Sequence, residues 1–116
     1  MNVKRIVANI AVSNTADALL FYRDILGLEI AMDLGWVVTL SSPETMSPQL
    51  SVATEGGSGT PVPHLSIEVD DIDEAQRRVR KADWTFEYGP VNEPWGVRRF
   101  YVRDPLGRLV NILSHA

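Results

Sequence analysis

Few residues of this chain carry side chains that could do chemistry, and most of them lie in its second half. His64 could act as a general base or anchor a ligand, because imidazole titrates near neutral pH. The alternative is a histidine that only forms hydrogen bonds within a pocket. We favour that alternative over catalysis, because the sequence offers no evident partner that would fix the tautomer of the ring.

Two arginines of one predicted strand, Arg99 and Arg103, could clamp an anionic ligand, because guanidinium groups bind carboxylate or phosphate through two hydrogen bonds. The alternative is a surface salt bridge with one of the fifteen acidic residues. We favour the salt bridge for Arg103, which adjoins a turn, whereas the sequence does not decide for Arg99. Glu68 is interpreted as a solvated rim carboxylate or a dimer contact.

Two tryptophans lie beside predicted turns and could stack on a planar ligand. Trp95 belongs to a Pro-Trp-Gly turn, and Trp36 follows Gly35 at the start of a predicted strand. The alternative is that the indole of Trp95 is buried and only anchors its loop, and the sequence does not decide between the two. His115 is the penultimate residue, so we expect it to fray and assign it no role.

The composition excludes several classes of function. The chain has 116 residues and no cysteine, which suits one domain and excludes disulfides, thiolate metal sites and a cysteine nucleophile. The net charge of -4 gives no basic footprint for nucleic acid. No apolar run approaches the ~20 residues that cross a bilayer, and the first residues do not resemble a signal peptide. We therefore expect a cytoplasmic protein without nucleic-acid or membrane partners.

The predicted elements repeat the order strand, helix, strand, strand, strand. In the first half the helix follows the candidate caps at 13–15 and ends at Gly27; in the second half Asp71 and Glu74 form a capping box. The first copy has strands at 4–12, 28–34, 36–41 and 49–53 and a helix at 16–26. The second copy has strands at 64–69, 84–88, 98–103 and 108–113 and a helix after Asp71.

Three segments resemble the glyoxalase, bleomycin-resistance and extradiol-dioxygenase superfamily (vicinal oxygen chelate), and its bleomycin-resistance-like group most closely. They are Phe21 to Leu28, His64 to Asp71, and Pro94 to Gly107 with its Pro-Trp-Gly and Asp-Pro-x-Gly turns. The resemblance implies an α+β fold of two βαβββ modules, whose eight strands form an open curved sheet around a cavity with the helices outside. It also implies a homodimer, although the modules could pair within one chain or between chains.

We accordingly predict a single domain over residues 1–116. Its first module covers 1–55, a glycine-rich linker covers 56–63, and its second module covers 64–116.

In the metal-dependent members of the superfamily, four side chains reach into the cavity, and they are typically His, Gln or Glu. The resemblance places Val7, Ser51, His64 and Asn111 at these positions. One imidazole, one amide, one hydroxyl and one hydrocarbon make a poor ligand set for a divalent ion. We therefore expect no metal or other cofactor, with a divalent metal as the alternative.

Strand alternation predicts which other side chains share the cavity with His64. Arg99, Tyr101 and Arg103 should face it from one strand, and Asn111 from the next. The leading hypothesis is a protein that sequesters a planar or aromatic compound, with stacking and polar contacts from the predicted ligand-binding residues Val7, Trp36, Ser51, His64, Trp95, Arg99, Tyr101 and Asn111. The alternatives are a metal-dependent lyase, isomerase, thiol transferase or dioxygenase, a metal-free enzyme with His64 as base, and a purely structural module.

Overall fold

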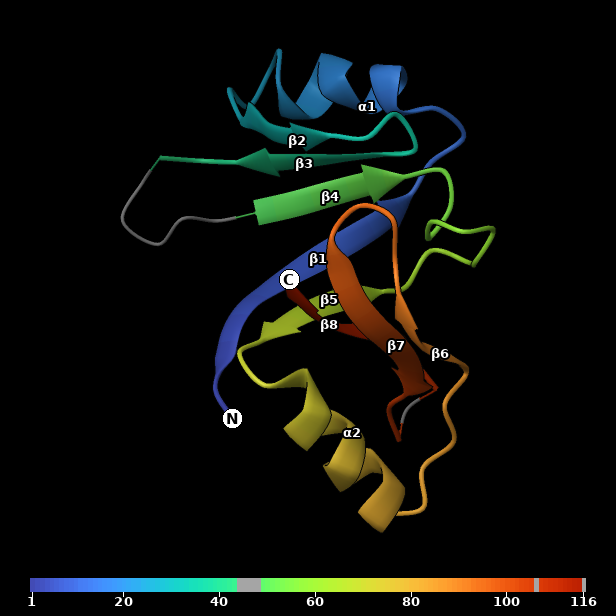
Figure 1. The fold of residues 1–116 in the computed structure, drawn as a ribbon. Coiled ribbons are helices and arrows are strands. Elements are labelled where there is room, and N and C mark those ends of the chain that lie inside the picture. The colour runs from blue at the N-terminus through green and yellow to red at the C-terminus, as the bar shows by residue number, and fades with distance from the viewer. Residues whose placement is uncertain (44–48, 106, 116) are drawn as a thin grey trace. The chain divides into compact units, whose positions relative to one another are not determined.

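The computed structural model describes residues 1–43, 49–105 and 107–115 (Figure 1). Within these residues, eight strands and two helices follow one another in the predicted order. The first half contains β1 (Val3–Ala11), α1 (Thr15–Tyr22), β2 (Glu29–Asp33), β3 (Val37–Ser41) and β4 (Gln49–Ala53). The second half contains β5 (Leu65–Val69), α2 (Ile72–Lys81), β6 (Tyr88–Asn92), β7 (Val97–Arg103) and β8 (Leu109–His115).

The strands form a mixed sheet in the order β2-β3-β4-β1-β5-β8-β7-β6, which confirms the predicted α+β fold with a repeated βαβββ unit. The pairs β1–β4 and β5–β8 are parallel, and the pairs β2–β3, β3–β4, β6–β7 and β7–β8 are antiparallel. The chain divides into two compact units. We call residues 7–62 the N-terminal unit, and residues 1–6 with 63–116 the C-terminal unit. No helix in the described part of the chain is long and apolar enough to span a membrane.

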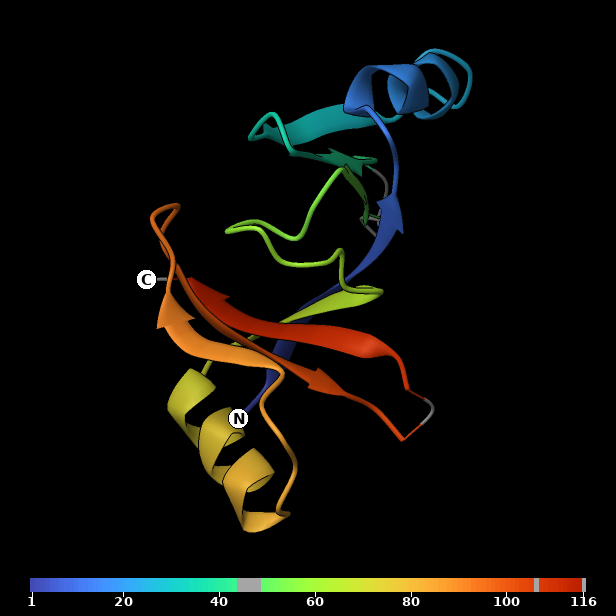
Figure 2. The ribbon, with the colours of Figure 1, turned by 90° about the vertical axis from the view of Figure 1, so that its right-hand side faces the viewer.

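The core of the C-terminal unit lies between its strands and α2. Figure 2 shows α2 packed along one side of these strands. Phe100 and Val102 of β7 and Val110 of β8 are buried there beside Ala75 of α2. Side chains alternate along a strand, so the neighbours of these residues project from the other side of the sheet. The alternation predicted for β7 and β8 is therefore confirmed.

The N-terminal unit repeats this arrangement with α1. Val38, Leu40 and Val52 form its buried cluster, and Leu19 and Tyr22 of the helix pack against it. Tyr22 therefore belongs to the core, whereas Phe21 beside it is exposed.

The two helices begin at their predicted caps. The side chain of Asn14 accepts a hydrogen bond from the backbone N–H of Asp17, and that of Asp71 accepts one from Glu74. Helix α1 ends at Tyr22, earlier than the predicted Leu26. The chain continues in turns up to Leu26 because the carbonyls of the last helical turn accept hydrogen bonds from residues four and five positions later.

The prediction of a strand over 84–88 is wrong in position, because the strand at this point, β6, covers Tyr88–Asn92. Gly89 explains the difference: its φ is +73°, and a Cβ there would lie 2.6 Å from the carbonyl oxygen of Arg99. Only glycine lets the backbone pass β7 this closely. The predicted strand ended just before this Gly-Pro pair, whereas β6 begins at Tyr88 and bulges at the pair.

Candidate ligand-binding face of the C-terminal unit

One row of side chains crosses the C-terminal unit on the side turned away from α2. The strand register places Ser66 beside Asn111, Asn111 beside Tyr101, and Tyr101 beside Tyr88. We call this side of the unit the distal face. Its members from β5, β7 and β8 are Ser66, Glu68, Val97, Arg99, Tyr101, Arg103, Leu109, Asn111, Leu113 and His115.

The centre of the distal face is an ion pair between Arg99 and Glu93. Nη2 of Arg99 lies 2.6 Å from Oε2 of Glu93, and Nε donates to the same oxygen at 2.9 Å. Each side chain is only 3% exposed. Arg99 is thus neither the surface salt bridge nor an uncommitted anion clamp, the two readings between which the sequence could not decide.

Three aromatic rings surround the guanidinium group. Its carbon lies 4.9 Å from the ring centre of Trp95, 5.0 Å from that of Tyr101 and 5.3 Å from that of Tyr88. Distances of this size allow cation–π attraction, which strengthens when the cation is removed from water. The structure therefore brings together three of the predicted site residues, Trp95, Arg99 and Tyr101, and adds Tyr88 and Glu93 to them.

The hydroxyl groups of the two tyrosines complete the polar contacts of the pair. Tyr88 donates to the carboxylate of Glu93, with 3.2 Å to each oxygen, and Nη1 of Arg99 donates to the hydroxyl of Tyr101 at 2.9 Å. A buried ion pair repays its desolvation cost only when such additional hydrogen bonds satisfy its remaining groups. The five side chains thus form one cluster around a buried ion pair, and removing either charge would leave the other uncompensated.

Asn111 has an unused acceptor. Its Nδ2 donates to Oγ of Ser66 at 3.1 Å, while its Oδ1 is buried and has no hydrogen-bond partner within the described part of the chain. Buried amide oxygens are rarely left without a donor. The residue neighbours Tyr101 in the β7–β8 register, so this acceptor belongs to the same face as the cluster.

His64 lies just before β5 and is exposed. Its Nδ1 accepts a hydrogen bond of 3.3 Å from the backbone N–H of Leu109, and its own backbone N–H donates to the carbonyl of Leu109 at 2.8 Å. The neutral ring therefore carries its proton on Nε2. This contact fixes the tautomer that the sequence left open, and it engages the nitrogen that a general base would need.

The remaining predicted site residues belong to the N-terminal unit. Val7 is buried in β1, and Ser51 shares a buried hydrogen bond of 2.7 Å with the hydroxyl of Thr39. Asn9 pairs with Ser51 in the register of β1 and β4, on the side away from α1. Trp36 is half-buried immediately before β3.

The four positions that the resemblance assigns to metal ligands do not fit a divalent ion. Val7 offers no donor atom, Ser51 is committed to Thr39, His64 binds a backbone amide through Nδ1, and Asn111 offers one neutral oxygen. A divalent metal ion prefers a site that combines several carboxylate, imidazole or amide ligands. Within residues 1–43, 49–105 and 107–115, no three histidine, aspartate or glutamate side chains are grouped so that they could hold a metal ion.

Two charged residues of the distal face lie near its ends and have structural partners. Arg103 is exposed, lies 3.3 Å from Glu87, and donates to the carbonyl of Gly107 at 3.0 Å, in agreement with the salt bridge that we favoured.

Glu68 lies 3.7 Å from Lys4, 3.1 Å from Arg5 and 2.9 Å from His115. It therefore joins β1 to the end of β8, and the expectation that His115 frays is wrong because β8 extends to this residue. Burial raises the pKa of Glu68, but the hydrogen bond from His115 and the neighbouring positive charges outweigh it, and the net pKa lies below the ordinary value.

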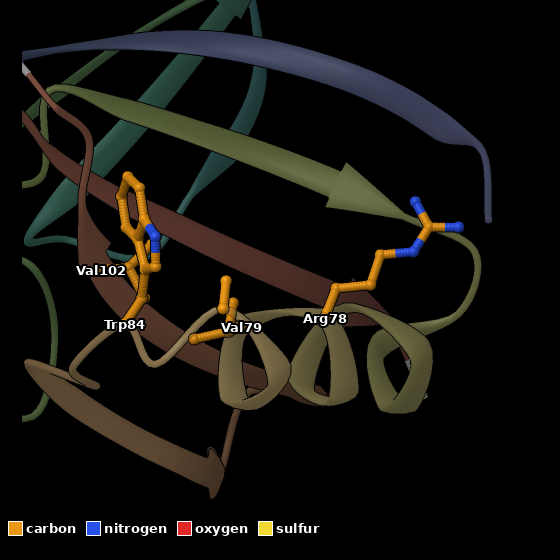
Figure 3. A pocket seen from close by; sticks show the side chains of 5 residues that line it. Arg78, Val79, Trp84 and Val102 are labelled. Carbon is orange, nitrogen blue, oxygen red and sulfur yellow. The ribbon is translucent and has the colours of Figure 1, made fainter.

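A separate groove of 280 Å³ lies on the opposite side of the C-terminal unit, beside α2. Figure 3 shows Val79 between Arg78 at one end of the groove and Trp84 with Val102 at the other. Arg78 is already paired with Glu74, at 2.9 Å. The groove is thus a mostly apolar hollow on the helix side, separate from the candidate site.

The comparisons with known proteins agree with this fold. The profile of the Glyoxalase/Bleomycin resistance protein/Dioxygenase superfamily matches residues 4–112. No curated protein matches the sequence at a significant level.

Three similar solved structures, each less than 25% identical to this chain, support the fold alone. A superfamily member from Vibrio splendidus is 19% identical, with 99% of this chain and 100% of that chain covered and a TM-score of 0.66. A methylmalonyl-CoA epimerase from Mycobacterium tuberculosis is 18% identical, with 98% and 87% covered and a TM-score of 0.65. A protein described as an NAD-dependent benzaldehyde dehydrogenase from Legionella pneumophila is 18% identical, with 97% and 100% covered and a TM-score of 0.76.

Proposed function

Because the chain belongs to the Glyoxalase/Bleomycin resistance protein/Dioxygenase superfamily, we propose that it is a cytoplasmic protein that binds and sequesters a planar or aromatic small molecule. The ligand lies on the distal face of the C-terminal unit, within the sheet cavity that the superfamily resemblance implies. Its binding needs no metal and no other cofactor. Trp95 and Tyr101 supply aromatic contacts, and Asn111, Arg99 and His64 supply polar ones.

The observation that carries this proposal is the aromatic cluster around Arg99. Ligand sites combine apolar and aromatic surface with a few polar groups in fixed positions. The Glu93–Arg99 pair fixes the rings of Tyr88, Trp95 and Tyr101, and both Tyr88 and Trp95 are only half-buried. A buried ion pair is not needed for stability, since apolar residues of similar volume usually serve as well. A role in recognition explains why this face carries one.

The competing proposal is a metal-dependent lyase, isomerase, thiol transferase or dioxygenase. Such an enzyme uses its metal as a Lewis acid on the substrate, and the side chains at the four mapped positions are poor ligands for that metal. A metal-free enzyme with His64 as base is also disfavoured, because the Leu109 amide engages the unprotonated nitrogen of its ring.

Two measurements test the proposal. A thermal-shift screen of aromatic compounds against the purified protein should find ligands that raise the melting temperature, since a ligand that binds only the folded state stabilises it. Elemental analysis of protein purified without chelators should find no stoichiometric divalent metal. A bound metal together with turnover of a substrate would replace the proposal with the enzymatic alternative.

We also propose a homodimer. The N-terminal unit exposes several large apolar side chains between residues 20 and 34, and α1 has no fully buried residue. Exposed apolar patches of this kind mark interaction surfaces. Sedimentation velocity should give a dimer, and Ile25→Glu, at a side chain that is 70% exposed, should weaken it. Thr85→Glu, at an exposed position of the C-terminal unit, is the control. A wild-type monomer at all concentrations would exclude the dimer.

A further inference from the structure

We infer that the distal face selects uncharged aromatic compounds that carry an N–H or O–H donor, and that it discriminates against aromatic carboxylates. This inference rests on the proposed ligand-binding function and names the chemical class of the ligand. It follows from the pairing of charges on the face and from the single unused acceptor of Asn111.

The charge of Arg99 is already compensated inside the protein. Two of its nitrogens lie within 2.9 Å of the same carboxylate oxygen of Glu93, and a third nitrogen donates to Tyr101. A ligand carboxylate near this guanidinium would also approach the carboxylate of Glu93. It would lose its hydration and gain no uncompensated cation, which is unfavourable for an anion.

The other two charged side chains of the distal face, Glu68 and Arg103, are paired as well. Arg5 lies 3.1 Å from Glu68, and Glu87 lies 3.3 Å from Arg103. Glu68, Arg99 and Arg103 thus each already have an opposite charge beside them. None of these three side chains therefore offers an anionic ligand an uncompensated positive charge that would attract it.

Asn111 supplies the positive criterion. The residue is more than nine-tenths buried, its Nδ2 donates to Ser66, and its Oδ1 lacks a donor within the described residues. An amide oxygen can only accept, so the complementary ligand group must donate. A ligand with a carboxamide, amine or hydroxyl group beside its ring would satisfy this atom, whereas a carboxylate would place oxygen against oxygen.

Matched pairs of arenecarboxamides and arenecarboxylates built on one to three fused rings test the inference. Calorimetric titration of the wild-type protein at neutral pH should show each amide binding at least about tenfold more tightly than its carboxylate, the factor that one well-made hydrogen bond supplies. Carboxylates that bind as tightly as their amides, or more tightly, would overturn the inference while leaving the proposed function intact. If no member of the panel binds, the proposed function fails together with the inference.

Two variants test whether Asn111 and Glu93 cause the preference for amides over carboxylates. Asn111→Leu should abolish the preference by weakening the amides about tenfold, with little effect on the carboxylates. Glu93→Gln should leave Arg99 without its counter-charge and strengthen the carboxylates at least about tenfold. Circular dichroism checks that each variant is folded. If Glu93→Gln does not fold, Asn111→Leu and the wild-type pairs still decide, and an unchanged preference in Asn111→Leu contradicts the assignment.

Discussion

Nη2 and Nε of Arg99 both contact Oε2 of Glu93, at 2.6 and 2.9 Å, in a part of the C-terminal unit where both side chains are almost completely buried. The two residues lie at the two sides of one hairpin. The backbone N–H of Glu93 donates to the carbonyl of Val97 and closes the turn, and Arg99 follows two residues later on the same side of β7. The hairpin thus determines where the guanidinium and its ring of aromatic side chains lie.

Removing one member of this pair should be costly, and removing both should not. Glu93→Ala leaves a buried cation and should lower the free energy of unfolding by about 3–5 kcal/mol, whereas the double change Glu93→Leu with Arg99→Met should cost far less. Urea unfolding measures both. The matched control is Glu87→Ala, which removes the exposed pair with Arg103 and should cost about 0–1 kcal/mol. A single-variant loss no larger than that of the control would contradict the buried-pair account.

The carboxylate of Glu68 should make stability depend on pH. Its pKa is lower in the folded chain than the ordinary value because the hydrogen bond from His115 and the charges of Arg5 and Lys4 outweigh burial, which acts in the opposite direction. The unfolded chain therefore binds the proton more readily. The contribution is complete above the ordinary glutamate pKa of about 4.3 and is lost as the pH falls through the lowered value.

Thermal unfolding of the wild-type protein and of Glu68→Gln, followed from neutral to acidic pH, checks this sign. The two melting temperatures should differ at neutral pH and converge in acid. The control is Glu55→Gln, at a carboxylate that accepts a hydrogen bond from the backbone N–H of Gly59 in an exposed loop. A difference between wild type and Glu68→Gln that stays constant over the whole range would show that the carboxylate acts only through packing.

Most of the fold could be predicted from the sequence because short apolar-rich segments, separated by turn residues and helix caps, mark the strands and helices. Strand alternation, counted from the position that the resemblance gives His64, placed Arg99 and Tyr101 on one face of β7, and the burial of Phe100 and Val102 beside α2 agrees with this. The errors lie where the backbone departs from a regular period. At Gly89 a strand continues through a Gly-Pro pair, and after Tyr22 the helix gives way to turns.

The candidate site was less predictable, because its central contact depends on a turn. Trp95, Arg99, Tyr101 and Asn111 were proposed from alternation and from the resemblance. Glu93 was missed, because it lies outside the strands, immediately before the Pro-Trp-Gly turn. The geometry of the hairpin could have revealed it, because an acidic and a basic residue on the two sides of a tight turn, here Glu93 and Arg99, can meet across it.

Trp95 should contribute directly to ligand affinity. Trp95→Ala removes a half-buried indole beside the guanidinium of Arg99 and should weaken an aromatic ligand from the screen by about three- to tenfold, given the usual worth of an aromatic contact. Trp84→Ala is the control, because Trp84 lines the groove on the helix side of the same unit. Calorimetric titration of the three proteins decides. Equal losses in the two variants would contradict a site on the distal face.

Gly89 should be the glycine that tolerates alanine least. Its φ of +73° already disfavours a side chain, and the added Cβ would lie 2.6 Å from the carbonyl oxygen of Arg99 and 3.0 Å from the backbone nitrogen of Val91, neither of which can move without distorting the pairing of β6 with β7. Gly35→Ala is the matched control, since its φ is +87° but nothing lies within 4 Å of the added atom. We expect Gly35→Ala to lower the free energy of unfolding by about 1–2 kcal/mol, the cost of a left-handed conformation alone.

Gly89→Ala should cost clearly more than this control, because close contact with backbone atoms is added to the same conformational cost. It should also weaken ligand binding, since Tyr88 lies next to the altered residue and donates to Glu93. Urea unfolding and calorimetric titration of both variants provide the two measurements. If both glycines tolerate alanine equally, the close approach of β6 to β7 at this position is wrong, and with it the reason that the strand begins at Tyr88.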